Sequence, residues 1–212
     1  MELRRDLTLE LRELTQRSYL LALATVSLLD LENSDVVAKL PKAVNQLCSD
    51  GRIVPDESIE MSVQEVYRLK PSFASFTTDL LLVELQAIFH THLMLAAGYT
   101  LEEPALQIES LLAKLWPRDV RSNNAWAYKE VVLLTEVRNA VMHARGQIDR
   151  RSQRLLDAGW SLQELESEPR LGSRSYSDFL RFKRAVRTVA NEAIPESRLR
   201  RIAAGGLRSV EE

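Results

Sequence analysis

The sequence predicts an all-α protein, a helical bundle without a β-sheet. Apolar residues recur at helical spacing along most of the chain, and no segment alternates apolar and polar residues with β-branched side chains, as a strand would. Hydrophobic residues make up 45% of the 212 residues, and glycine and proline occur only 7 times each. This composition supports a sizeable core and favours helices over a sandwich or a barrel.

Residues 1–70 are expected to form a helical extension that packs on the core. Leucines at helical spacing predict a first helix over residues 2–31: Leu3, Leu7, Leu11 and Leu14. A second helix is expected over residues 35–47, because a polar residue that can cap it comes just before. Residues 59–69 are expected to form either a short helix or an irregular connection to the rest of the chain.

Residues 71–195 are expected to form the main helical domain. Pro71 suits the first turn of a helix, which predicts that a long apolar helix starts near it and covers residues 73–97. A further helix is expected over residues 101–116, because its apolar pattern ends at Pro117.

Three more helical segments are expected in the second half of the chain, followed by a flexible, arginine-rich tail. The segments cover residues 123–144, 150–168 and 177–193, and the tail covers residues 196–212. The middle segment is expected to break at Ala158-Gly159, since glycine favours the left-handed conformation that ends helices.

The charge and the cysteine content restrict the partners and the compartment. The net charge is −2, so the chain is no bulk polycation, and any contact with RNA must come from a local patch. The single cysteine, Cys48, fits a reducing cytoplasm, and with 3 histidines it gives no plausible zinc-ligand set. Residues 1–13 are too charged for a secretion signal, and the apolar run over residues 19–29 is too short to span a bilayer. We therefore expect a cytoplasmic protein without membrane contact, metal or cofactor.

The most informative stretch is residues 136–146, at the end of an apolar helix. Arg138 can neutralise a phosphate, and His143 can move a proton near neutral pH, as cleavage of an RNA backbone requires. His143 would take the proton of a 2′-hydroxyl or protonate the leaving 5′-oxygen, while Arg138 would stabilise the charge on the phosphorus. Asn139 would hold His143 in the right tautomer or bind the phosphate, and no metal is required. The need for a 2′-hydroxyl makes RNA the expected substrate.

The spacing within this stretch leaves two routes to a working site. Five residues separate Arg138 from His143, which in a continuous helix turns their side chains about 140° apart. They would converge if the helix ends or loosens near His143, as Gly146 suggests, or if two copies bring their motifs together across a two-fold axis. A purely structural interpretation is the alternative, because an arginine and a histidine at a helix C-terminus favour the dipole and bond to free carbonyls.

Charged residues around the motif are candidates for supporting roles. Glu84 lies in an apolar run on the preceding long helix and is expected either to orient Arg138 or to face solvent. Glu136 shares a helical face with Asn139 and His143 and is a second acid that could orient the motif. Four arginines follow the motif and are expected either to bind RNA phosphates or to form a plain solvated face: Arg145, Arg150, Arg151 and Arg154.

The motif resembles the signature of the HEPN superfamily, the higher eukaryotes and prokaryotes nucleotide-binding domains. Arg138, the polar Asn139 and His143 match that signature, and residues 136–137 and Gly146 are similar to its flanks. The resemblance implies a helical, metal-independent endoribonuclease that acts as a homodimer with its cleft at the interface. Such domains serve as toxins in toxin-antitoxin modules or as antiviral defence effectors, and some pair with a minimal nucleotidyltransferase antitoxin.

The resemblance covers part of the chain and leaves two other functions open. Its specific match is confined to residues 136–146, its helical pattern extends over residues 70–195, and the segment before residue 70 resembles nothing in the family. A HEPN module that binds or regulates without catalysis is the first alternative. An unrelated helical adaptor protein, in which the motif is a coincidence, is the second.

Overall fold

The computed structural model describes residues 2–29, 63–100, 102–117, 121–143, 148–149, 151–172 and 174–194. All regular secondary structure in these ranges is helical, which confirms the all-α prediction. The helix expected over residues 35–47 and the tail over residues 196–212 lie outside the described residues.

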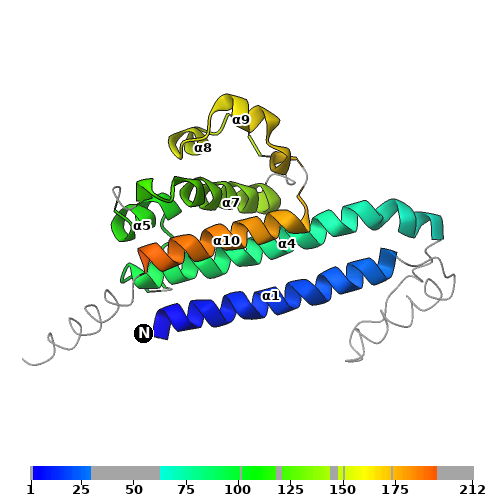
Figure 1. The fold of residues 1–212 in the computed structure, drawn as a ribbon, viewed down its shortest axis with the longest axis horizontal. Coiled ribbons are helices and arrows are strands. Elements are labelled where there is room, and N and C mark those ends of the chain that lie inside the picture. The colour runs from blue at the N-terminus through cyan, green and yellow to red at the C-terminus, as the bar shows by residue number, and fades with distance from the viewer. Residues whose placement is uncertain are drawn as a thin grey trace, which may run out of the picture.

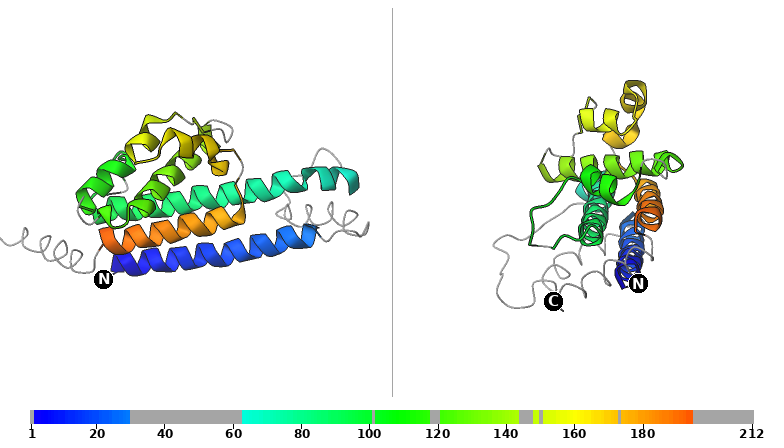
Figure 2. Two further views of the ribbon diagram at one scale, coloured as in Figure 1. Left: turned by 45° about the horizontal axis from the view of Figure 1, so that its top comes forward. Right: turned by 90° about the vertical axis from the view of Figure 1, so that its left-hand side faces the viewer.

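Long helices form the body of the molecule (Figures 1 and 2). They are α1 (Glu2–Leu29), α4 (Val63–Ala96), α7 (Ala125–His143) and α10 (Tyr176–Ala193). α1 packs along α4, α10 lies beside both, and α7 covers α4 and α10 on the side away from α1. Shorter elements complete the described fold around α7: α5 (Ile108–Leu115), α8 (Gln153–Asp157), α9 (Leu162–Ser167) and the 3₁₀ helix η1 (Pro169–Leu171).

A single apolar core joins the long helices. Leu14 of α1, Leu82 of α4, Val132 of α7 and Phe182 of α10 are fully buried members of it. α1 therefore packs on the core. The boundary expected between residues 70 and 71 falls inside α4, which crosses it as one helix.

The start of α4 corrects the prediction. The helix begins at Val63 rather than near Pro71, so most of the segment expected as a short helix or connection belongs to it. A proline inside a helix lacks one backbone donor and crowds the carbonyl four residues earlier, and α4 continues through Pro71 despite this cost. The segment Ser75–Ala96 is long and apolar enough to cross a membrane, with a mean hydropathy of 1.2, but half of it is buried inside the bundle. Core packing therefore accounts for its composition.

The start of α5 is the second correction. This helix begins at Ile108 rather than near residue 101. The backbone N–H of Thr100 donates to the Glu103 carboxylate (2.9 Å) and closes a turn. Residues 104–107 then have no regular secondary structure, and proline at position 104 cannot donate a helical hydrogen bond.

The other described helices agree with the prediction to within a few residues. α7 ends at His143, and α10 begins at Tyr176 and ends at Ala193. The break expected in the segment between them is confirmed, because Gly159 has φ +97°, in the left-handed region, and separates α8 from α9.

A buried network of charges ties α7 to the segment that leads into α10. Arg170 of η1 donates to Glu130 of α7 (Nη1–Oε2, 2.5 Å), and the two side chains are only 3% and 2% exposed. Arg170 also donates to Glu168 (Nε–Oε1, 2.7 Å), and Arg181 of α10 reaches the second oxygen of Glu130 (2.7 Å). Each buried charge is therefore paired, which offsets the loss of its hydration.

The protonation equilibria of these groups reflect the pairing. Burial by itself lowers the pKa of Arg170, but hydrogen bonds to Glu168 and Glu130 outweigh it and raise the pKa above its usual value. The hydrogen bond from Arg170 likewise lowers the pKa of Glu168. Both side chains are therefore held in their charged forms.

Removing one carboxylate from this network should destabilise the protein strongly. We expect Glu130→Ala to lower the free energy of unfolding by about 3–5 kcal/mol, because it leaves the buried Arg170 guanidinium with only one partner. Urea unfolding followed by circular dichroism measures the change. Glu102→Ala, at an exposed position, is the control and should cost less than about 0.5 kcal/mol. A loss below about 1 kcal/mol for Glu130→Ala would contradict the role of the network.

A second prediction concerns the start of α9. The backbone N–H of Ser161 bonds to Glu164, and Lys129 donates to the same carboxylate, so the pKa of Glu164 falls from 4.5 to about 2. A lowered folded-state pKa contributes stability above the unfolded value of 4.5, and this contribution disappears as the pH falls towards 2. The native protein should therefore have a higher free energy of unfolding than Glu164→Gln at neutral pH. The two free energies should become equal in acid. Urea unfolding across this range tests the prediction, and a difference that stays constant would refute it.

Candidate active site at the end of α7

The motif occupies the last turns of a helix that is otherwise a core element. The middle of α7 is buried, from Glu130 to Thr135, and Val137 and Ala140 extend its buried side. Burial decreases towards the end of the helix, where Arg138 is half-buried and His143 is exposed. The fold therefore fixes the backbone of the motif while leaving the His143 side chain open to solvent.

Asn139 contacts Arg138 in this structure. The guanidinium Nη1 of Arg138 donates to the amide Oδ1 of Asn139 (3.1 Å), and both side chains are half-buried. Asn139 was expected to hold His143 or to bind a phosphate, and this bond instead gives it a part in holding Arg138. A guanidinium restrained by a neutral amide keeps its full charge for an anion.

Regular helix geometry turns the side chains of Arg138 and His143 in different directions within one chain. α7 stays helical through His143, so the helix does not loosen between the two residues. Five residues of regular helix rotate the side chains by about 140° and separate them by about 7.5 Å along the axis. Convergence where the helix ends at His143 and convergence across a two-fold pair both stay predictions.

The structure corrects the role expected for Arg154. Its guanidinium is bonded to Glu109 of α5 (Nη2–Oε2, 2.7 Å) and to Glu136 of α7 (Nη1–Oε1, 3.0 Å). The hydrogen bond with Glu109 is the main reason why the pKa of Arg154 is raised. Two carboxylates therefore already occupy this guanidinium, which acts as a clamp between α5, α7 and α8 and not as a free RNA-binding group.

The other arginines expected to bind RNA divide into two groups. Arg151 is exposed, close to the clamp formed by Arg154. Arg145 and Arg150 lie outside the described residues. Arg151 is thus the member of the set whose exposure in the described structure agrees with a phosphate contact.

The two acids expected to orient Arg138 pair with other arginines. Glu84 of α4 accepts from Arg17 of α1 (2.5 Å) at the surface. Glu136 accepts from Arg154 and also receives the Ser152 hydroxyl (3.4 Å). Glu84 therefore lies at the surface, which was the alternative expected for it, and Glu136 is engaged by Arg154 instead of Arg138. Sequence reasoning missed Glu109, the other half of the clamp, because it lies 45 positions from Arg154 and no local pattern links them.

Comparisons with family models, with curated proteins and with solved structures gave no match for this chain. The motif, its placement and the charges around it are therefore the features that point to a function.

The clamp gives a test that separates a structural arginine from a surface one. We expect Arg154→Ala to lower the free energy of unfolding by about 1.5–3 kcal/mol, because it leaves two half-buried carboxylates without their shared donor. Arg151→Ala, three residues away and exposed, should change it by less than about 0.5 kcal/mol. Chemical unfolding of the two variants measures the difference, and equal stabilities would argue against the clamp.

Proposed function

We propose that this protein is a metal-independent endoribonuclease of HEPN type that acts as a homodimer. The observation that carries the proposal is the combination of an exposed His143 with a half-buried Arg138, restrained by Asn139, at the end of a core helix. A helix C-terminus that needed only a cation for its dipole would not require the amide-restrained arginine one turn earlier. The arrangement instead suits recognition of a phosphate beside a group that transfers protons.

The proposed reaction uses the 2′-hydroxyl of RNA as the nucleophile. His143 takes the proton of that hydroxyl as the 2′-oxygen forms a bond to the phosphorus. Arg138 stabilises the negative charge that develops on the phosphate oxygens. The bond from phosphorus to the 5′-oxygen breaks, and this oxygen leaves with a proton from the solvent. The products are a 2′,3′-cyclic phosphate and a 5′-hydroxyl, so atoms and charge balance.

The divergence of the two side chains within α7 is the reason for proposing a dimer. A two-fold pair can place Arg138 of one copy beside His143 of the other and so create two equivalent sites. In the cell such an enzyme would act in the cytoplasm as a toxin or antiviral effector, held in check by an antitoxin. A HEPN module that only binds RNA or a partner remains the second candidate, since it would need the same surface without the chemistry.

The decisive experiment is cleavage of labelled RNA in the presence of EDTA. We expect native protein to release cyclic-phosphate ends, and Arg138→Ala and His143→Ala each to reduce the rate by about 100-fold or more. His143 is exposed, so its replacement should leave the fold intact, which circular dichroism verifies. Glu102→Ala is the matched surface control and should cleave at the native rate.

Mixing the two inactive variants tests the shared site directly. A heterodimer of Arg138→Ala with His143→Ala would have one site with both groups intact, so random mixing should restore about a quarter of the native activity. Recovery supports sites built from two chains. Native activity without recovery would place both groups in one chain, and no cleavage by a folded dimer would favour the binding module. A folded monomer without activity would favour the unrelated adaptor.

A further inference from the structure

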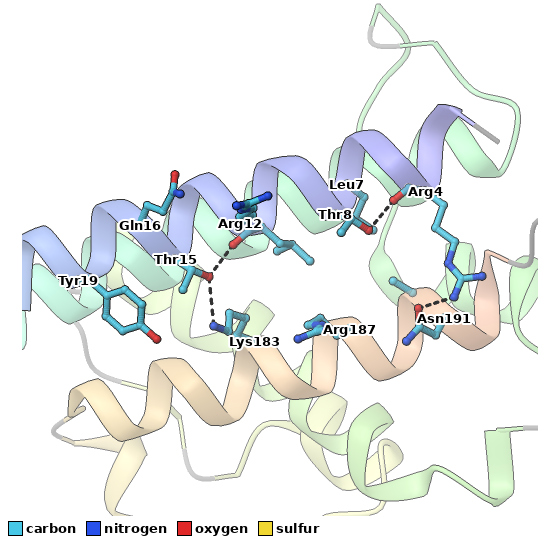
Figure 3. Close-up of a pocket in the computed structure, with 12 residues that line it drawn as sticks. Arg4, Leu7, Thr8, Arg12, Thr15, Gln16, Tyr19, Lys183, Arg187 and Asn191 are labelled. Atoms are coloured by element: carbon cyan, nitrogen blue, oxygen red, sulfur yellow. Dashed lines mark hydrogen bonds between the residues drawn. The ribbon is translucent and has the colours of Figure 1, made fainter.

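A groove with a volume of about 460 Å³ runs between α1 and α10 (Figure 3). The two helices are bridged near its ends, by Arg4 to Asn191 (2.7 Å) and by Lys183 to the Thr15 hydroxyl (3.1 Å). Between these bridges Arg187 of α10 lines the groove. The groove is thus a built feature with side chains from both helices directed into it.

The groove is strongly basic in a protein whose net charge is −2. Four of the 12 residues that line it are cations, and none of the 12 carries a carboxylate: the cations are Arg4, Arg12, Lys183 and Arg187. Glu10 of α1 faces α4 instead, where it lies 3.7 Å from His92. The positive charge of the groove is therefore not neutralised by the residues that line it.

The cations also act on one another. Burial, followed by the nearby charge of Arg187, lowers the pKa of Lys183. Two like charges are thus held on one helix face, where their repulsion costs stability. An anion bound in the groove would relieve this repulsion, which gives an anionic ligand a physical reason to bind.

The remaining lining determines which kind of anion fits. Hydroxyl and amide groups alternate with the cations, as they do in proteins that contact phosphates: Thr8, Thr15, Gln16, Tyr19 and Asn191. The apolar lining residues Leu7, Leu11 and Ala190 are buried and offer no open pocket. An acidic amphipathic helix would need such pockets for its apolar side chains. The lining therefore favours a chain of phosphates over an acidic protein segment.

We propose that this groove binds the sugar-phosphate backbone of single-stranded RNA, an inference that rests on the proposed ribonuclease function. The lining of α1 extends from Arg4 to Tyr19, about 22 Å of helix, which accommodates several nucleotides. Tyr19 is 59% exposed at one end of the groove, where its ring can stack on a base.

The direction of the groove relates it to the motif. Its Tyr19 end lies beside the start of α10, since the neighbouring Ser18 bonds to Tyr176 (3.0 Å). α7 runs antiparallel to α10, as two contacts between them show. Arg181 of α10 pairs with Glu130 of α7. Arg184, later in α10, stacks on Trp126, which comes earlier in α7. The C-terminal end of α7 thus points towards the same end of the bundle (Figure 1). RNA that leaves the groove there emerges at the end of the bundle where α7 ends at His143.

Charge reversal within the groove tests the proposal against a matched control. The parent protein is His143→Ala, which binds RNA without cutting it if both proposals hold. Fluorescence anisotropy with labelled oligouridylate should show that Arg12→Glu and Arg187→Glu each weaken binding by about tenfold or more, with a shallower dependence on salt. Arg5→Glu makes the same charge change on α1 outside the groove and should weaken binding less than about twofold. Arg12 and Arg187 are exposed, and thermal melting checks that the variants fold.

The possible outcomes separate this proposal from the ribonuclease proposal. With His143 intact, the groove variants should raise KM for RNA about tenfold while kcat changes less than about twofold, since they leave the chemical groups in place. If the groove variants bind RNA as tightly as Arg5→Glu does, the groove proposal is overturned and the ribonuclease proposal is unaffected. A different result is that the protein binds polyglutamate and not RNA, with the groove variants abolishing this binding. That result would overturn the groove proposal in favour of an acidic protein partner. RNA binding lost in the groove variants, without any cleavage by native protein, would support the groove and reject the enzyme.

Discussion

The pairing of Arg170 with Glu130 is the constraint on which the arrangement of the helices depends. Arg170 lies in the short η1 turn, yet its guanidinium reaches into the core and meets a carboxylate of α7. Arg174, also buried, continues the chain of contacts by donating to Asp79 of α4 and to the Arg170 carbonyl. A slide of α7 by one turn would shift Glu130 by about 5.4 Å and leave buried charges without partners. Apolar contacts alone would tolerate such a slide far more readily.

This constraint is what gives the end of α7 a defined position. The ion pair at Glu130 fixes the first half of the helix, and the clamp of Arg154 on Glu136 fixes the second half. The last turn, with Met142 and His143 exposed, extends from this anchored segment. A site built on a rigid element loses little conformational entropy when it binds a substrate, so its groups can act without prior rearrangement.

The sequence contained enough information for the helices but not for the contacts between distant charges. Local periodicity and a single glycine at position 159 sufficed to place α10 and the break between α8 and α9. The same local signals misplaced the start of α4, because a proline signals a helix start only statistically. The motif itself was visible because its residues are adjacent. The two ion pairs could not be seen in the sequence, because only the tertiary fold brings their partners together. Glu130 and Arg170 lie 40 positions apart, and Glu109 and Arg154 lie 45 positions apart.

The uninterrupted helix through His143 has a consequence for how such a protein would be controlled. If the proposed ribonuclease takes its two groups from two chains, a newly made copy is inactive until it meets a second one. The amount of assembled enzyme then rises with the square of the protomer concentration at low expression, by simple mass action. A low protomer concentration then keeps the protein inactive without an inhibitor, and any factor that raises the local protomer concentration activates it. The geometry of a single helix would thereby set the protomer concentration at which activity begins in the cell.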